Sequence, residues 1–160
     1  MARKPQIDVR WPTAEDGRYL IDHLRAADRM ELDATIGEAC PYAAMELVLA
    51  RCSHAWAIFG DDRLLMIGGL VPTGTLLTGD EAEPWMLGTT HLERLPGALT
   101  RVALRYLAVM KGHYRRLANH VDARNHTSIR WLKRLGFTVH AETVPYGPYG
   151  LPFHLFEMDH

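Results

Sequence analysis

VDARNHTSIRWLKRLGF, from Val121 to Phe137, is the stretch of sequence that decides the fold. Its pattern predicts a strand over 117–121, a helix over 126–135 and a further strand over 137–141. Asn125 is a preferred N-cap residue, and Gly136 suits the end of a helix. A helix that begins here presents free N–H groups and the positive end of its dipole, which suit an anionic or carbonyl-bearing ligand.

The segments on both sides complete a mixed pattern of helices and strands. We expect strands over 7–11, 54–59, 64–71, 85–89 and 152–158, and helical segments from Thr13, over 28–40, over 45–52 and over 97–110. The last of these is the clearest helix, because its apolar residues recur along one face. The order predicts one α/β (α+β) domain over residues 1–160, with a mixed sheet of about six or seven strands flanked by about four helices.

Glycine and proline mark several of these boundaries. The run from Gly60 to Arg63 separates two apolar segments and predicts a β-hairpin. Gly68-Gly69 inside the second strand predicts a bulge or a close backbone approach. Pro41 is expected to stop the second helical segment, and Gly112 to cap the long helix.

Composition excludes several classes of function. The chain is 48% hydrophobic and 23% charged, as in a folded globular protein, and its net charge of -1 gives no reason to expect nucleic-acid or membrane binding. No run approaches the ~20 apolar residues of a membrane span, and the N-terminus lacks a signal-peptide core. We therefore expect a cytoplasmic protein in which Cys40 and Cys52 are buried thiols and the tryptophans are core residues. The nine histidines show no metal-binding spacing, so no metal site is expected.

The stretch from Val121 to Phe137 resembles the second half of the acetyl-CoA site of the GNAT N-acetyltransferases. In that family a strand ends at an asparagine, a small residue follows three positions on, and the helix closes with Gly-Phe. Asn125, Ser128, Gly136 and Phe137 match this pattern. The resemblance implies a GNAT fold, acetyl-CoA as the cofactor, and contacts from Asn125 and Ser128 to the coenzyme.

The loop before the long helix resembles the coenzyme loop of the same family, (Gln/Arg)-x-x-Gly-x-(Gly/Ala). Arg94 and Gly97 match this loop, whereas Leu99 departs from it and Pro96 removes one N–H donor. Bulk at Leu99 is expected to crowd the phosphate-binding backbone. The resemblance implies coenzyme contacts from loop and central-strand residues, namely Arg94, Gly97, Ala98, Leu99, Leu87 and Thr89.

Direct acetyl transfer to an amine needs a base and donors for the developing oxyanion. We expect Glu31 to be the base, since the early helices border the acceptor groove in this fold, and Tyr146 to donate a proton. The alternatives are Asp33, Glu81, Glu83 and His91 as bases and Tyr149 as donor. In many GNAT enzymes a tyrosine seven residues after the asparagine protonates the leaving thiolate, but Leu132 occupies that position here.

A narrower resemblance is to the GNAT-like proteins of tailed bacteriophages, some of which are classed as internal virion proteins. It rests on residues 24–32, 85–89, 119–125 and 129–137, and implies a phage-encoded protein of the host cytoplasm or the virion. Two functions therefore stand open. One is an acetyl-CoA-dependent N-acetyltransferase that acts on an amine acceptor, either a small molecule or a protein. The other is a non-catalytic GNAT-fold module that serves in the virion or binds a host protein.

Overall fold

The computed structural model describes residues 3–160, apart from the side chains of Pro96 and Ala98. The strands are β1 (Ile7–Arg10), β2 (His54–Gly60), β3 (Arg63–Pro72), β4 (Glu81–Gly88), β5 (Arg116–Asp122), β6 (Thr138–Tyr146) and β7 (Leu151–Asp159). The helices are α1 (Ala14–Asp22), α2 (Ala26–Ile36), α3 (Pro41–Arg51), α4 (Pro96–His113) and α5 (His126–Leu135), with a 3₁₀ helix η1 (Thr90–Arg94) before α4. The expected mixed α/β architecture is confirmed.

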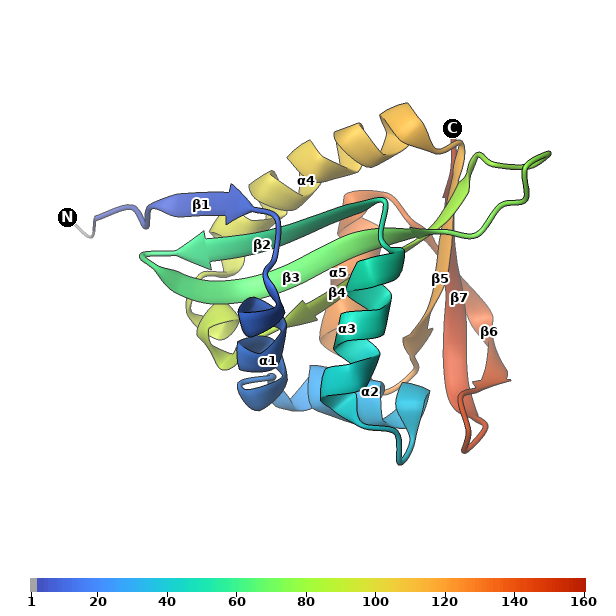
Figure 1. Cartoon of the computed structure of the whole chain (residues 1–160). Coiled ribbons are helices and arrows are strands. Elements are labelled where there is room, and N and C mark those ends of the chain that lie inside the picture. The colour runs from blue at the N-terminus through green and yellow to red at the C-terminus, as the bar shows by residue number, and fades with distance from the viewer. Residues whose placement is uncertain (1–2) are drawn as a thin grey trace.

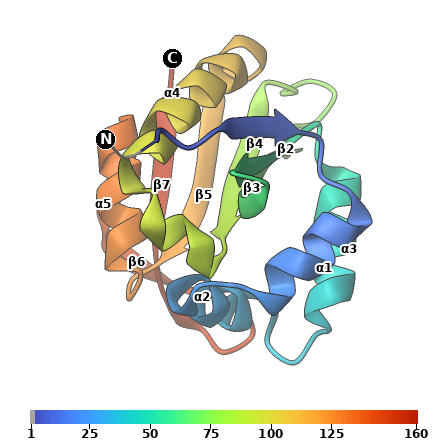
Figure 2. The same cartoon turned by 90° about the vertical axis from the view of Figure 1, so that its left-hand side faces the viewer.

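The strands form one sheet in the order β1-β2-β3-β4-β5-β7-β6. All neighbours are antiparallel except β4 and β5, which run parallel. Helices α1, α2 and α3 lie on one side of the sheet, and α4 and α5 lie on the other (Figures 1 and 2). No helix in the described part of the chain is long and apolar enough to span a bilayer.

Each face of the sheet contributes to a different part of the core, because successive side chains of a strand point to opposite faces. Ile67, Trp85 and Leu87 pack with residues of α1 and α3. Met66 and Met86, one residue away on the same strands, pack instead with Leu99 of α4 and Trp131 of α5. The face that a β4 side chain occupies therefore follows from whether its number is odd or even.

Local sequence signals account for several element boundaries. Thr13 and Asp16 form a reciprocal capping box at the start of α1. The β2–β3 hairpin turns through Asp61 and Asp62, both at positive φ (47° and 65°), as a two-residue turn requires. Gly136 ends α5 in the left-handed conformation, with φ of 99°.

Two helix boundaries differ from the expectation. Pro41 begins α3 and does not stop the segment before it, because α2 already ends at Ile36 with Gly37 as its C-cap. The N–H that proline lacks is not needed in the first helical turn. The long helix α4 continues through Gly112 to His113, and Tyr114 is its C-cap.

Gly69 allows a close approach rather than a bulge. A Cβ at this position would lie 2.9 Å from both Cys52 Sγ and Trp85 Nε1, whereas the register shift of the β2–β3 pair lies at Ile58–Phe59. Two burial predictions were wrong: Cys40 is exposed at the start of α3, and Trp11 is 54% exposed just after β1.

Candidate active site

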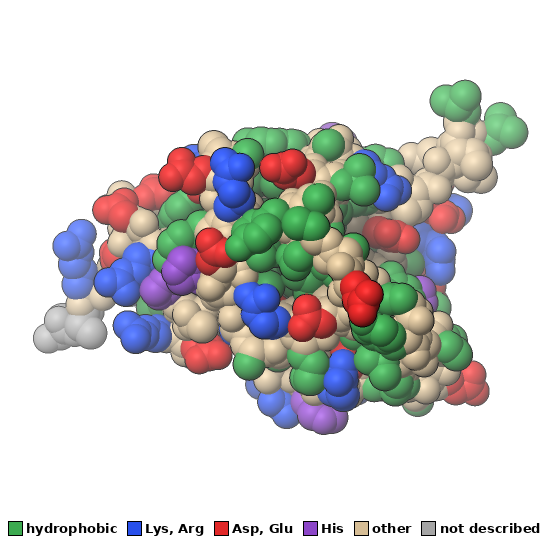
Figure 3. All heavy atoms as spheres, turned by 60° about the horizontal axis from the view of Figure 1, so that its bottom comes forward, with side chains coloured by type: hydrophobic (Ala, Val, Ile, Leu, Met, Phe, Trp, Pro, Cys, Tyr) green, Lys and Arg blue, Asp and Glu red, His purple; other side chains and the backbone are tan. Residues whose placement is uncertain are grey.

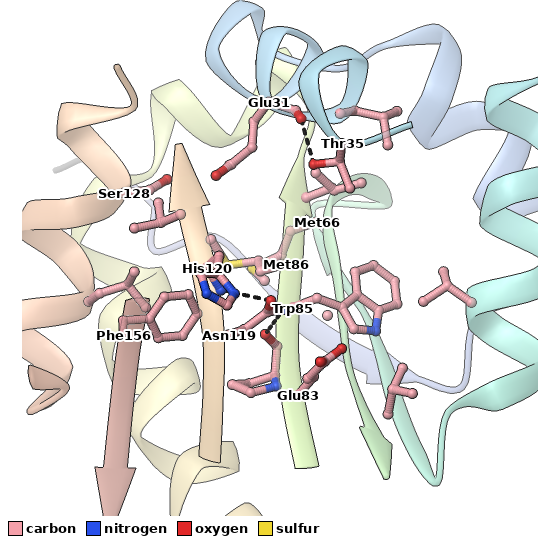
Figure 4. A pocket seen from close by; sticks show the side chains of 18 of the residues that line it. Glu31, Thr35, Met66, Glu83, Trp85, Met86, Asn119, His120, Ser128 and Phe156 are labelled. Atoms are coloured by element: carbon pink, nitrogen blue, oxygen red, sulfur yellow. Dashed lines mark hydrogen bonds between the residues drawn. The ribbon is translucent and has the colours of Figure 1, made fainter. Parts of the chain in front are cut away.

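The parallel strands β4 and β5 separate soon after they begin. Their pairing is confined to Glu81 with Arg116 and Ala82 with Leu117. Beyond these residues the two strands diverge, and the space between them opens toward their C-terminal ends (Figure 4). The inner edges of both strands therefore lack the hydrogen bonds that a continuous ladder would supply.

The inner edge of β4 has one open backbone position. The Pro84 carbonyl accepts a hydrogen bond from Asn119 Nδ2 at 3.0 Å, and the Gly88 N–H donates to Asp28 Oδ2 at 2.7 Å. Backbone groups alternate in direction along a strand, so Met86, midway between Pro84 and Gly88, also points its N–H and C=O away from β3. No group in the described part of the chain bonds to them. Met86 therefore presents a free donor and a free acceptor to the opening.

The inner edge of β5 is already engaged. The Asp122 N–H donates to Glu31 Oε1 at 2.6 Å, and the His120 N–H donates to Asn119 Oδ1 at 2.7 Å. Because its amide nitrogen also reaches the Pro84 carbonyl, the Asn119 side chain bridges the two strands (Figure 4). It closes the narrow end of the opening.

A cavity of about 350 Å³ passes through the sheet at this opening. Its volume lies within the range of small-molecule sites. Its lining comes from α2 and α3 on one side of the sheet and from α4 and α5 on the other. Most lining side chains are apolar; the polar and tyrosine members are Glu31, Thr35, Glu83, Tyr106, Asn119, His120, Ser128 and Tyr146.

The start of α4 is open. Its N-cap, Leu95, provides no side-chain hydrogen bond to the first turn. A Cβ added to Gly97 would meet nothing within 4 Å, and Arg94 beside it is exposed. Leu99 does not crowd this surface, since its side chain is buried with Leu92 in the core beneath the helix. The side chain of Ala98 lies outside the described residues.

The surface around η1 carries positive charge. Burial lowers the pKa of His91, and the nearby guanidinium groups of Arg63 and Arg94 lower it further. Arg63 comes from the β2–β3 hairpin and was not expected at this position. Together with the free N–H groups of the first turn of α4, these residues favour an anion.

The start of α5, in contrast, is committed to contacts within the protein. Asn125 is 1% exposed, and its Oδ1 accepts the Ser128 N–H as an N-cap. Its Nδ2 donates to Glu31 Oε2 at 3.0 Å. The Ser128 hydroxyl accepts from Arg25 at 3.2 Å. Both polar groups of the Asn125 side chain therefore have partners.

Two carboxylates join α2 to the two strands, and one of them belongs to a buried ion pair. Arg25 Nε lies 2.6 Å from Asp28 Oδ2, and Asp28 is 1% exposed. Asp28 also accepts the Gly88 N–H, while Glu31, one helical turn later, accepts the Asp122 N–H. The two carboxylates hold α2 across the wide end of the opening, one on each strand.

Glu31 is the titratable group best placed for proton transfer. Burial raises its pKa to about 7, against the opposing effect of the hydrogen bonds from Asp122 and Asn125; the charges of Asp28 and Asp122 raise it further. Its side chain lines the cavity where β5 ends (Figure 4). It can therefore both accept and release a proton near neutral pH.

Tyr146 lies on the α2 side of the cavity, with its ring stacked on His120 at a centroid distance of 4.8 Å. Burial raises the pKa of Tyr146, and the charges of Glu83 and Glu31 raise it further. Burial lowers the pKa of His120, so its imidazole is neutral at pH 7. Both rings thus present uncharged aromatic faces.

The alternative candidates for base and proton donor differ in whether they line the cavity. Glu83 lines the cavity. Glu81 lies 3.8 Å from Arg116, and His91 forms a hydrogen bond with Tyr19 at 3.0 Å. Asp33 and Tyr149 are exposed, and neither lines the cavity. Of the alternatives, the cavity brings Glu83 together with Glu31 and Tyr146.

The central-strand prediction names Leu87 and Thr89, and the structure shows where their backbone groups point. The backbone N–H and C=O groups of odd-numbered β4 residues such as Leu87 point toward β3. The same holds for Thr89, which donates its N–H to the Leu65 carbonyl at 2.9 Å. The Thr89 hydroxyl is fully buried against the Leu64 carbonyl. Met86 is therefore the residue whose backbone faces the opening. Leu132 lines the cavity from α5 and brings no proton donor to it.

Besides Arg63, the polar residues that sequence reasoning missed include Arg25, Asp28, Asn119 and His120. A polar residue inside an apolar strand was the available signal for Asn119 and His120. Arg25 and Asp28 sit three residues apart on a helix, a spacing that predicts a surface ion pair as readily as a buried one. Their roles depend on the register of β4 against β5, which local pattern does not supply.

Of the comparisons with known proteins, the one with solved structures bears on the architecture. No family model matches the chain, and no curated protein matches its sequence. Among solved structures it is similar to an N-acetyltransferase from Staphylococcus aureus Mu50, with a TM-score of 0.72, 17% identity and coverage of 96% of this chain and 98% of that one. It is also similar to a Vibrio cholerae spermidine N-acetyltransferase in complex with CoA and spermine (TM-score 0.68, 12% identity, 96% and 95% covered).

A third similar structure is an acetyltransferase of the GNAT family from Streptococcus pneumoniae, with a TM-score of 0.65 and 15% identity. The likeness covers 96% of this chain and 99% of that chain. At such low identities the likeness concerns the fold, and it extends over nearly the whole length of both proteins. The chain has the GNAT fold.

Proposed function

We propose that this protein transfers an acetyl group from acetyl-CoA to a primary amine. The observation that carries the proposal is the cavity through the sheet between β4 and β5, with the free N–H and C=O of Met86 on its wall. A thioester and an amine need to meet in one enclosed space but arrive by separate routes. A cavity that is lined from both sides of the sheet suits that requirement. The fold neighbour in complex with CoA and spermine supports the same reading.

The residues on the α4 side fit the donor substrate. Free N–H groups at the start of α4 suit the pyrophosphate, and Gly97 leaves room for it. Arg94 and Arg63 supply positive charge nearby. The Met86 N–H and C=O suit the amides and the thioester carbonyl of the pantetheine arm. Both the oxygen and the nitrogen of the Asn125 side chain are bonded within the protein, so we assign it the part of holding Glu31 and α5 in place.

Glu31 fits the role of base. An acceptor amine arrives as an ammonium ion and must lose a proton before its nitrogen lone pair can attack the thioester carbonyl carbon. Glu31 takes that proton; the new N–C bond forms, and the C–S bond breaks with its electron pair on sulfur. The nitrogen loses a second proton as the neutral amide forms, and that proton restores the group that protonates the thiolate. The Met86 N–H stabilises the carbonyl oxygen during this step.

The leaving thiolate then gains a proton. Leu132 has no proton to give, so another group must supply it. Tyr106 and Tyr146 are the phenols that line the cavity in the described part of the chain. We assign the role to Tyr146, which keeps its proton at neutral pH because burial raises its pKa. Replacement of Tyr146 by Phe should lower kcat more than the same change at Tyr106.

Calorimetric titration with acetyl-CoA, followed by a thiol-release assay with amines, tests the proposal. Gly97→Glu places a carboxylate where phosphate is expected to bind, and should weaken coenzyme binding at least ~10-fold. Gly97→Gln, of the same size without the charge, is the matched control and should bind more tightly than Gly97→Glu. Absence of heat at millimolar acetyl-CoA, or equal affinity of the two variants, would refute this placement of the donor substrate.

A second candidate function is a non-catalytic, phage-type module that binds a virion or host protein. It is favoured by Leu132 and by the loop between β3 and β4, which stands clear of the molecule (Figures 1 and 3). Leu76 and Leu77 at its tip are fully exposed. Exposed apolar side chains on a protruding loop are typical of a contact with another protein. Lack of acetyl-CoA binding, together with loss of partner capture in Leu76→Ser/Leu77→Ser, would favour this role.

A further inference from the structure

The part of the cavity on the α1–α3 side of the sheet, opposite the proposed donor substrate, is called the acceptor side. It has a carboxylate at each end. Glu31 lies at the wide end of the opening, above the end of β5, and Glu83 lies near the narrow end (Figure 4). Glu83 has the same parity as Trp85, which packs with residues of α1 and α3, so its side chain lies on the acceptor side of the sheet. The two carboxylates are thus separated along the direction of β4.

Glu83 is available to a ligand. It is exposed, and no basic side chain within residues 3–160 forms an ion pair with it. Its charge acts on the cavity, because it raises the pKa of Tyr146 and opposes the effect of burial on the pKa of His120. A carboxylate beside two neutral aromatic rings is a favourable place for an alkylammonium group.

The wall between the two carboxylates is apolar or aromatic. Trp85, His120 and Tyr146 contribute rings, and Leu32 and Ile36 of α2 contribute aliphatic surface. No lysine or arginine is found among the described residues that line the cavity. An anionic acceptor would meet two negative ends here, and a strongly polar one would leave its hydroxyl groups unpaired against the wall.

We propose that the acceptor is an aliphatic diamine or polyamine, with one amine at the reacting position and a second ammonium group bound by Glu83. This inference rests on the proposed acetyl transfer. Met86 and Glu83 are three residues apart on β4, about 10 Å at the rise of a strand. Allowing for the reach of the Glu83 side chain, that distance suits two nitrogens joined by about five carbons. Glu31 removes the proton from the nearer nitrogen, while the farther one stays charged throughout.

Steady-state kinetics with a matched pair of acceptors tests this assignment. 1,5-Diaminopentane and pentylamine have the same chain length and differ in the second amine. With acetyl-CoA saturating, we expect a KM for the diamine about 5- to 20-fold below that for pentylamine. Glu83→Gln should bring the ratio of the two KM values close to one with little change in kcat. Glu81→Gln removes a charge two residues away on the same strand, outside the cavity, and should preserve the preference.

The outcomes separate the two proposals. Turnover of both amines with equal KM, or a diamine preference that survives Glu83→Gln, would overturn the diamine assignment and leave acetyl transfer standing. Failure to bind acetyl-CoA in the calorimeter would overturn the transfer itself, and the acceptor assignment with it. Coenzyme binding without turnover of either amine would overturn the diamine assignment alone.

Discussion

The two sides of the opening between β4 and β5 use similar elements in opposite ways. On the β5–α5 side, meaning the inner edge of β5 and the first turn of α5, the His120 and Asp122 N–H groups and the Asn125 side chain are all bonded within the protein. On the β4–α4 side, meaning the inner edge of β4 and the first turn of α4, Met86 and Gly97 face open space. A strand end followed by a helix start is therefore not by itself a binding site. What matters is whether its N–H groups already have acceptors.

The largest expected effect concerns Glu31, the titrating group at the wide end of the opening. Glu31→Gln should lower kcat/KM by about 10²- to 10⁴-fold, because an amide cannot take the ammonium proton. In the unmodified protein kcat/KM should rise with pH through an apparent pKa of about 7, as the carboxylate forms. The variant should lack that rise. Asp33→Asn, on the exposed face of the same helix, is the control and should retain it.

Met86→Pro tests the open edge of β4 directly. Proline removes the N–H that faces the opening, and should lower kcat by about 10²- to 10³-fold, as loss of one oxyanion donor does. Because that N–H makes no ladder bond with β3, the substitution breaks no bond between the strands, and the fall in thermal midpoint should reflect only the lost packing of the Met86 side chain with Leu99 and Trp131. Met86→Leu keeps the N–H and a similar volume and should stay active. An active Met86→Pro protein would show that the β4 edge takes no part in the chemistry.

The pH dependence of stability sharpens the account of Glu31. Its folded pKa of about 7 lies above its ordinary value of 4.5, so the folded state holds the proton more tightly than the unfolded state. The stabilisation from protonation is fully present below pH 4.5 and is lost as pH rises to about 7, a change of about 3 kcal/mol. Denaturant melts give the free energies of unfolding of the protein and of Glu31→Gln. Plotted against pH, these free energies should have the same slope above pH 8 and different slopes between pH 4.5 and 7. Identical slopes in that window would argue against a raised pKa.

Asn125→Ala has the smallest expected effect and tests the β5–α5 side, where the polar groups are already bonded within the protein. It removes the α5 cap and the amide partner of Glu31, and should lower the free energy of unfolding by about 1–3 kcal/mol in urea. Coenzyme affinity, measured where the variant is folded, should stay within a few-fold. A large loss of affinity with unchanged stability would instead place Asn125 among the coenzyme contacts.

Much of the fold can be predicted from the sequence, because many element boundaries follow from local signals. The Thr13–Asp16 capping box, the Asp61-Asp62 turn and the Asn125–Gly136 limits of α5 each depend on neighbours in the chain. Glu31 and Gly97 are predicted through the resemblance to the GNAT proteins, and Tyr146 through its residue type and its place in a turn near the last strands. All three lie at the cavity or at the start of α4.

The remaining parts of the site depend on long-range register. Choosing Met86 over Leu87 requires knowing which β4 groups face β3, and that is fixed by contacts such as Asp28 with Gly88, 60 residues apart. The commitment of Asn125 to Glu31 spans 94 residues in the same way. Pattern within a segment carries no information on such partners, so a motif can be recognised before the contacts of its polar groups within the protein are known.

The central claim is that the β4–α4 side, and not the β5–α5 side, receives acetyl-CoA. Amide-resolved NMR of the isotopically labelled protein during titration with acetyl-CoA tests it directly. The N–H resonances of Met86, Gly97 and Leu99 should show the largest saturable shifts, while those of Asp122 and Ser128, already bonded to Glu31 and Asn125, should move little. Shifts concentrated at Asp122 and Ser128, or none at millimolar acetyl-CoA, would contradict the account.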